Sequence, residues 1–201
     1  MLSWSKELID SLEWKRFEEL CAGYFQAKGW RTRLTRLGAD GGVDIYLYKT
    51  ESDTKPLGII QCKAWNTYKV GVKPIRELYG VMAAEQTPLG IFITSGKFTQ
   101  EAREFAAGKH VKLMTGDNLL KLILGLPEDK QSSLLNAITK GDYTTPSCPS
   151  CGTKMVLRTS SKGGNPGRQF WGCTNFPRCR TTLPYRKAHS SLPSTQAGWR
   201  G

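Results

Sequence analysis

Apolar residues between positions 12 and 25 recur every three or four residues, so they fall on one stripe of a helix. The stripe consists of Trp14, Phe17, Leu20, Cys21, Tyr24 and Phe25. Gly29 follows the stripe and predicts the end of the helix. Similar spacing predicts helices over residues 74–85, 99–107 and 118–124, and Thr99 is suited to cap the second of these.

Short runs rich in apolar residues predict strands over residues 30–34, 43–48, 57–65, 89–94 and 111–114. The predicted order is a helix, a β-meander, and then an alternation of helices and strands. This order indicates an α/β domain over residues 1–125, with a mixed sheet flanked by helices.

Three further segments follow this domain. Residues 126–145 are expected to form a helical spacer, through Leu134, Leu135 and Ile138, and a linker. Residues 146–185 form a small cysteine-containing domain, and residues 186–201, rich in Ser, Gly and Pro, are expected to be disordered.

The composition narrows the class of protein. Of the 201 residues, 39% are hydrophobic and 23% are charged, which supports a packed core and excludes a wholly disordered chain or a collagen-like repeat. No apolar run is long enough for a membrane span, and the first 20 residues lack the apolar stretch of a signal peptide. A cytoplasmic protein is therefore expected.

The charge is concentrated near the C-terminus. The formal net charge is +12, and residues 141–201 hold nine basic residues and one acidic residue, Asp142, a net of +8. Such an excess favours a polyanionic partner, most often nucleic acid. A solvated basic tail is the alternative.

Candidate catalytic residues lie in the run GADGGVDIYLY and, after a turn, in LGIIQCKAW. Gln61 and Lys63 share one face of their strand because side chains alternate. If Tyr48 faces Ile59, then Asp44 lies opposite Lys63, and a slip of two residues would preserve the shared face. Asp44 and Gln61 can offer oxygen ligands to a hard cation, and Lys63 can orient or deprotonate the attacking water. A surface ion pair between Asp44 and Lys63 is the alternative.

A second carboxylate is expected from the first helix. On a helical wheel, Glu18 lies beside Cys21 and Phe25 at the rim of the buried stripe, whereas Glu19 points to solvent. A carboxylate in that position is costly unless it is paired or binds a metal. Glu18 is therefore a candidate metal ligand.

The runs WKRFEEL, YFQAKGW, GADGGVDI, IIQCKAW and GIFITSGKFTQEA, in this order, resemble the Mrr-like restriction endonuclease catalytic domain over residues 10–120. That family belongs to the PD-(D/E)xK nuclease superfamily, in a variant with glutamine in the last motif. The resemblance implies a restriction-endonuclease-like mixed sheet flanked by helices. It also implies hydrolysis of DNA, with restriction of foreign DNA as the role.

The family's functional positions map onto this chain residue by residue. Asp44 resembles the metal-binding aspartate, and Gln61 and Lys63 resemble the QxK pair. Glu18 resembles the helix glutamate, and Asp40 matches the acidic residue of the glycine-rich turn, with a role that the resemblance leaves open. Because glutamine replaces a third carboxylate, substrate phosphate is expected to complete the Mg²⁺ site.

Ser95, Gly96 and Lys97 lie between a predicted strand and a predicted helix. They can contact phosphate there, although turn formation explains Ser95 and Gly96 equally well.

Four of the six cysteines form a metal-binding pattern. Cys21 and Cys62 are solitary and are expected to be buried apolar residues. The others are two pairs separated by 21 residues, namely Cys148 with Cys151 and Cys173 with Cys179. This pattern predicts a structural zinc ribbon, because four thiolates leave no open position for water. Zinc would supply folding free energy on the order of 10 kcal/mol.

Basic and aromatic residues alternate within this module. They are Arg158, Lys162, Arg168, Phe170, Trp171, Phe176, Arg178 and Arg180. Aromatic faces can stack on unpaired bases while the cations follow the nucleic-acid backbone. The alternative is that Phe170 and Trp171 pack over the zinc site. The run CPSCGTKMVLR…FWGCTNFPRCR resembles the C-terminal zinc finger of bacterial topoisomerases over residues 146–184, a finger associated with single-stranded DNA.

The sequence therefore indicates a Mg²⁺-dependent DNA endonuclease of restriction type with a zinc-finger DNA-binding module. Cutting both strands needs two active sites, so a homodimer or a DNA-bridged pair is one expectation. Two alternatives remain: a repair or recombination nuclease acting on branched or single-stranded DNA, and a catalytically inactive DNA-binding protein.

Overall fold

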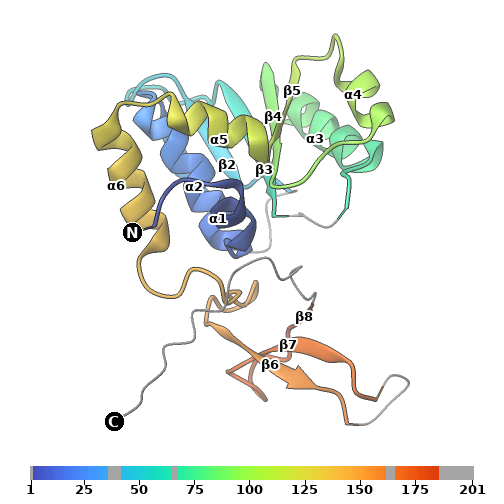
Figure 1. Cartoon of the computed structure of the whole chain (residues 1–201). Helices are drawn as coiled ribbons and strands as arrows, with labels where there is room; N and C mark the ends of the chain where they lie inside the picture. Colours follow the sequence, from blue (N-terminus) through green and yellow to red (C-terminus); the bar gives the residue numbers. More distant parts are fainter. Residues whose placement is uncertain (1, 36–41, 65–67, 162–165, 186–201) are drawn as a thin grey trace.

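The computed structural model describes residues 2–35, 42–64, 68–161 and 166–185 (Figure 1). A five-stranded sheet in the order β1-β2-β3-β4-β5 lies at the centre of the first domain. Three strands, β1 (Arg31–Leu34), β2 (Ile45–Tyr48) and β3 (Gly58–Lys63), are antiparallel neighbours. The next two, β4 (Leu89–Thr94) and β5 (Val111–Thr115), run parallel to β3, so the sheet is mixed as predicted.

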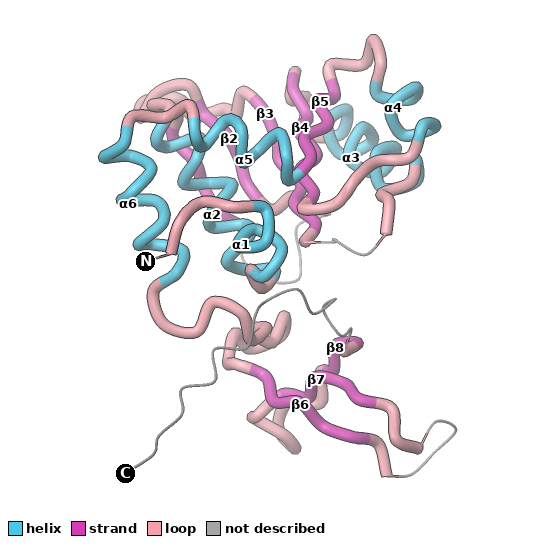
Figure 2. The backbone as a smooth tube through the Cα atoms, in the orientation of Figure 1, coloured by secondary structure: helices cyan, strands magenta, loops and turns pink. Residues whose placement is uncertain are grey.

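Helices cover both faces of this sheet (Figure 2). One face carries α1 (Lys6–Ser11), α2 (Trp14–Ala27), α5 (Gly116–Leu124) and α6 (Glu128–Thr139). The other face carries α3 (Val72–Ala84) and α4 (Gln100–Ala106). Each face has its own buried hydrophobic cluster, because strands buried on both sides must present apolar side chains in both directions.

The predicted ends of two helices are confirmed by their backbone. Gly29 follows α2 with φ +87°, a conformation that glycine adopts without steric cost. The Thr99 side chain accepts a hydrogen bond from the Ala102 N–H at 3.3 Å and so caps α4.

Two helices differ from expectation. A short separate helix, α1, precedes α2, and it lies outside the stripe that predicted α2. The helix expected to be a spacer, α6, packs against α2 instead, with Leu134 and Ile138 buried in the first domain's core. Its apolar stripe is covered by α2, so α6 belongs to the packed body.

The outer edge of the sheet at β1 carries stacked arginines. The Arg31 guanidinium lies 3.7 Å from the centre of the Tyr48 ring, and that of Arg33 lies 4.4 Å from the centre of the Tyr46 ring. Both tyrosines belong to the neighbouring strand β2, so the two arginines extend across the β1–β2 hairpin.

A separate antiparallel sheet forms the C-terminal module (Figure 1). Its strands are β6 (Met155–Thr159), β7 (Gln169–Cys173) and β8 (Thr182–Pro184). The buried hydrophobic cluster of this module consists of Cys148, Met155 and Cys173. Among the described residues, no helix is long and apolar enough to cross a membrane.

Candidate active site and metal centre

Asp44 directly precedes β2 and lies beside the end of β3, which carries Gln61 and Lys63. Ile45 pairs with Ile60, and the Asp44 N–H donates to the Ile60 carbonyl at 3.0 Å, so Asp44 lies beside Ile60 and Gln61 of β3. The expected partner was Lys63, so the register is shifted by two residues. Because side chains alternate with a period of two, Gln61 and Lys63 stay on one face of β3, whereas the alternation of β2 is interrupted at Asp44, since Val43 and Ile45 pack in the clusters on opposite faces of the sheet.

Local backbone contacts hold these side chains. The Cys62 N–H donates to Asp44 Oδ2 at 2.6 Å and fixes the carboxylate against β3. Gln61 is 6% exposed, and a Cβ on Gly42 would lie 3.0 Å from its Nε2 atom. Gly42 also has φ +89°, so a glycine there permits both the turn and the close approach of the Gln61 amide.

Glu18 joins the site from α2. The pKa of Glu18 is raised to about 8, first by burial and then by the negative charge of Asp44, while the Lys63 ammonium opposes the rise. Burial also raises the pKa of Asp44, against the effects of the Cys62 N–H and Lys63. The structure therefore brings Glu18, Asp44 and Lys63 within electrostatic reach of one another, whereas Asp40 lies outside the described residues.

The donor set fits a divalent cation. Two carboxylates that are partly removed from water repel each other, and a bound cation would relieve this repulsion. The amide oxygen of Gln61 adds a neutral ligand of the type that Mg²⁺ accepts. This candidate site has only two carboxylates. Within the described ranges, a group of three or more His, Cys, Asp or Glu side chains close enough to share a metal ion is found only in the C-terminal cysteine cluster.

A basic pocket of about 230 Å³ lies just beyond the end of β4, next to the end of β3. Three lysines, Lys6, Lys69 and Lys97, line it together with Ser95, Gly96, Tyr68 and Asp117. It adjoins Lys63, because the Ser95 N–H donates to the Lys63 carbonyl at 3.2 Å. Lys97 was a sequence candidate for phosphate contact, whereas no motif identified Lys6 or Lys69.

The four cysteines of the C-terminal module converge on one point. All four sulfur atoms lie within 4.8 Å of one another, with Cys148 Sγ 3.6 Å from Cys179 Sγ and Cys151 Sγ 3.4 Å from Cys173 Sγ. A tetrahedral ion with metal–sulfur bonds of about 2.3 Å needs sulfur–sulfur distances of about 3.8 Å. The cluster therefore fits a four-thiolate metal site.

The other two cysteines, Cys21 and Cys62, are buried as expected. Burial raises the pKa of the Cys62 thiol well above its ordinary range, so it stays protonated and apolar.

The aromatic residues of the module divide into two kinds. Trp171 packs against the buried cysteines and makes an edge-to-face contact with Tyr185, at 5.8 Å between ring centres. Phe170 is half-buried on the other side of β7, paired with Arg158 of β6. Phe176 is 61% exposed. Packing over the cysteine site thus accounts for Trp171 but not for Phe176.

The predicted cations of the module are exposed. Arg158, Arg168, Arg178 and Arg180 all reach solvent, and Lys162 lies outside the described residues.

Comparison with known families agrees with both halves of the chain. Residues 9–123, more than half of the sequence, match the family model described as restriction endonuclease. The chain belongs to this family. Residues 146–188 of this restriction endonuclease family member match the model described as topoisomerase DNA binding C4 zinc finger.

Individual relatives cover parts of the chain. An uncharacterized protein, y4cE, of Sinorhizobium fredii is 30% identical over 58% of this chain and 30% of its own length. The type IV methyl-directed restriction enzyme EcoKMrr of Escherichia coli is 31% identical over 48% of this chain and 32% of its own length. The chain thus spans about a third of the length of these curated relatives.

Among solved structures, the DNA modification-dependent restriction endonuclease AspBHI aligns with a TM-score of 0.48 at 19% identity. The alignment covers 69% of this chain and 41% of that chain.

Proposed function

We propose that this protein is a Mg²⁺-dependent DNA endonuclease whose C-terminal zinc module binds DNA. The proposal rests on the Asp44 carboxylate, which accepts from the Cys62 N–H between Gln61 and Lys63 and lies within electrostatic reach of Glu18 and Lys63, with the pKa values of both carboxyls raised. Membership of the restriction endonuclease family supports the same reaction class.

Each residue of the site has a role in this proposal. Asp44, Glu18 and the amide oxygen of Gln61 would hold the cation. Magnesium, when bound, polarises the scissile phosphate and makes a coordinated water more acidic. Lys63 orients the attacking water and offsets the negative charge that develops on the phosphate. Water attacks phosphorus in line with the leaving oxygen.

The basic pocket extends this site along the DNA backbone. Lys97 and Lys69 lie beside the strand end that carries Lys63, so a phosphate adjacent to the scissile one would meet them. Contacts of this type add affinity that is independent of sequence.

The zinc module would supply a second DNA contact. Zinc fits its four sulfur atoms, and its exposed arginines give the positive surface that a polyanion needs. The exposed Phe176 ring is available to stack on an unpaired base. This ring favours a second candidate function, cleavage of branched or single-stranded DNA in repair or recombination.

Restriction is the role we favour, by analogy with the relative named as a methyl-directed restriction enzyme. Modified DNA is therefore a substrate class to test. Cleavage of both strands would need two copies of the active site, supplied by a homodimer or by two chains meeting on DNA.

The deciding experiment is cleavage of supercoiled plasmid, methylated and unmethylated, in magnesium. Wild type should nick and linearise the plasmid, and Lys63→Ala should lose activity by about 10²- to 10³-fold, because an electrostatic contact to the transition state is removed. Lys112→Ala is the matched control, since Lys112 is an exposed lysine on β5 of the same sheet.

Equal activity in wild type and Lys63→Ala would overturn the assignment of the site. Cleavage restricted to junctions or single strands would support the repair role. DNA binding without cleavage of any of these substrates would indicate an inactive DNA-binding relative.

A further inference from the structure

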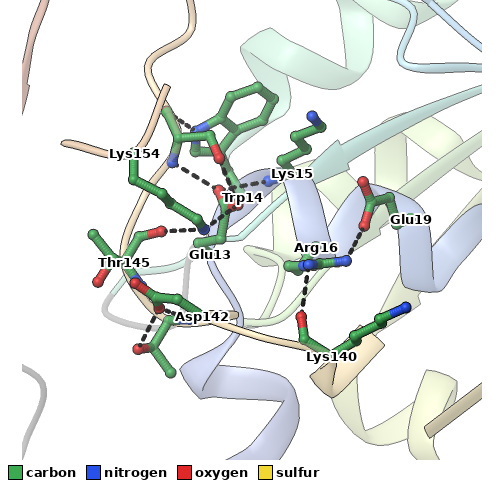
Figure 3. Close-up of polar contacts among 11 residues, drawn as sticks. Glu13, Trp14, Lys15, Arg16, Glu19, Lys140, Asp142, Thr145 and Lys154 are labelled. Carbon is green, nitrogen blue, oxygen red and sulfur yellow. Dashed lines mark hydrogen bonds and ion pairs between the residues drawn. The ribbon is translucent and has the colours of Figure 1, made fainter. Parts of the chain in front are cut away.

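A buried carboxylate, that of Glu13, joins the two halves of the molecule (Figure 3). Glu13 is 6% exposed and immediately precedes α2. Its carboxylate accepts hydrogen bonds from the Ser147 N–H at 3.1 Å and the Ser147 hydroxyl at 2.8 Å, and it pairs with Lys154 Nζ at 3.1 Å. It also accepts from the Lys15 N–H at 3.2 Å, in the first turn of α2. One side chain thus contacts both the zinc module and the nuclease domain.

The residues that Glu13 contacts lie at the two ends of the first cysteine knuckle. Ser147 directly precedes Cys148, and Ser147 and Lys154 face each other in an isolated β-bridge. Inside that bridge the Cys148 N–H donates to the Thr153 carbonyl at 2.7 Å and closes the loop that carries Cys151. The groups of Ser147 and Lys154 that donate to Glu13 are therefore held in this arrangement only while the knuckle is folded.

The chain around this contact is also tied to α2. The Trp14 indole N–H donates to the Ser147 carbonyl at 2.8 Å, and Arg16 Nη2 donates to the Lys140 carbonyl at 2.9 Å. Lys154 Nζ donates to the Thr145 carbonyl at 2.7 Å (Figure 3). The segment that connects the two domains is accordingly a fixed joint and not a loose tether.

Within the segment that connects the two domains, the turn at residues 142–145 is held by the side chain of Asp142. Asp142 Oδ1 accepts from the Thr145 N–H at 2.9 Å and from the Thr144 N–H at 3.1 Å. These bonds lower the pKa of Asp142 to about 2, so the carboxylate stays charged and keeps the turn closed throughout the physiological pH range.

We propose that Glu13 is a positioning residue that couples metal loading of the cysteine cluster to the nuclease domain. A knuckle of this size folds only with its metal bound. Without the metal, the Glu13 carboxylate loses three of its four hydrogen-bond donors and keeps only the Lys15 N–H, so the segment that holds it loses the bonds that tie it to the module. That segment is the start of α2, and Glu18 lies five residues further along the same helix.

The coupling must act in both directions. If loading the metal stabilises the folded start of α2, then the folded start of α2 favours metal binding by the same factor, and a variant that breaks the Glu13 contacts should bind the metal more weakly. The inference goes beyond cleavage of DNA, because it concerns communication between two modules in the free protein. It therefore holds or fails independently of the proposed nuclease activity.

The test is hydrogen–deuterium exchange on the full chain, with zinc bound and after its removal by a chelator, in the absence of DNA. The amides to follow are those of residues 17–20, of which Phe17 N–H donates to the Glu13 carbonyl at 3.0 Å. In wild type, zinc removal should speed their exchange by at least tenfold, while the amides of β4 stay unchanged. In Glu13→Gln, exchange at residues 17–20 should be fast with zinc present and should change less than twofold on its removal.

Glu19→Gln is the matched control. It makes the same change on the same helix, but the Glu19 carboxylate pairs with Arg16 at 2.9 Å and not with the zinc module. This variant should keep the wild-type dependence on zinc. If zinc removal leaves residues 17–20 unchanged in wild type, or if Glu13→Gln keeps the full dependence, the coupling is refuted.

A second measurement keeps the test decisive if Glu13→Gln does not fold. Ser147→Ala removes one donor to Glu13 and leaves the nuclease domain intact. Competition with a chromophoric chelator should show zinc affinity several-fold weaker in Ser147→Ala than in Glu19→Gln. Equal zinc affinities in these two variants would contradict the reciprocal coupling.

Discussion

The two domains of this chain are stabilised in different ways. The nuclease domain packs two hydrophobic clusters against the two faces of one sheet. The buried cluster of the zinc module consists of Met155 and two of the four cysteines. A segment of about 40 residues seldom buries enough apolar surface to fold alone, so metal ligands replace the core there. Heat and chelators should therefore act on different halves of the protein.

The largest effect is expected from removing zinc. Chelation should unfold β6, β7 and β8, because metal binding supplies on the order of 10 kcal/mol to such a module. The amides of β4 should keep their protection, since two apolar clusters cover that strand. Two-dimensional NMR of the full chain checks both statements. If residues 155–159 keep dispersed signals after chelation, the zinc module does not depend on its metal for folding.

A buried aromatic residue probes the other half. Phe92 in β4 is 0% exposed and packs edge-to-face against Phe98 at 5.9 Å. Phe92→Ala should lower the free energy of unfolding of the nuclease domain by about 3–5 kcal/mol. Phe176→Ala is the matched control on the zinc module, where an exposed ring is removed. Urea unfolding measures both variants, and a comparable loss in Phe176→Ala would remove the distinction between the domains.

A smaller effect concerns the carboxylates of the candidate site, which destabilise the domain that holds them. The pKa of Glu18 is raised from 4.5 to about 8 by burial, so the folded state retains a proton that the unfolded chain releases. Stability should therefore fall as pH rises from about 4.5 to 8. Without metal at pH 8, Glu18→Gln should be more stable than wild type by about 2–4 kcal/mol.

At pH 4 the free energies of unfolding of wild type and Glu18→Gln should nearly coincide, and urea unfolding at the two pH values measures the difference. Magnesium should narrow the gap at pH 8 by stabilising wild type alone. A gap that does not depend on pH would show that Glu18 is not held protonated in the folded protein.

The smallest effect concerns the DNA contacts that the nuclease domain adds to those of the zinc module. Lys97→Ala should weaken duplex binding a few-fold and reduce the slope of log affinity against log salt by about 0.9, the value for one phosphate contact. Lys112→Ala should leave both quantities unchanged. Fluorescence anisotropy at several salt concentrations checks this, and an unchanged slope in Lys97→Ala would place the DNA contacts of the pocket elsewhere.

Most of the sheet and its helices followed from the sequence because local patterns specify them. Apart from the half-buried Trp14, the apolar stripe that predicted α2 is the one buried in the core, and Thr99 and Gly29 mark helix ends through a local hydrogen bond and a local backbone conformation. The register of β2 on β3 was two residues off, because the turn between them sets it and periodicity alone does not. The packing role of α6 depends on α2, which lies more than 100 residues earlier.

The candidate sites were predictable to different degrees. The pattern of four cysteines predicted the metal cluster through spacing alone. Asp44, Gln61 and Lys63 needed the family resemblance to outweigh a surface ion pair, and their catalytic roles remain predictions. Glu13 gave no signal, because its partners lie 134 and 141 residues away. Lys6 and Lys69 reach the basic pocket from segments without a motif.

The arginines stacked on β1 bear on how two copies of this chain can meet. Among the described strands, β1 is outermost in its sheet, and one backbone edge of such a strand offers a place for a second sheet to join. Antiparallel joining there would set Arg31 and Arg33 of one copy against the same residues of the other, and like charges facing across strands repel. A continuous ten-stranded sheet through β1 is therefore disfavoured, and under the proposed function two copies acting on opposite DNA strands would associate through other surfaces or through the DNA itself.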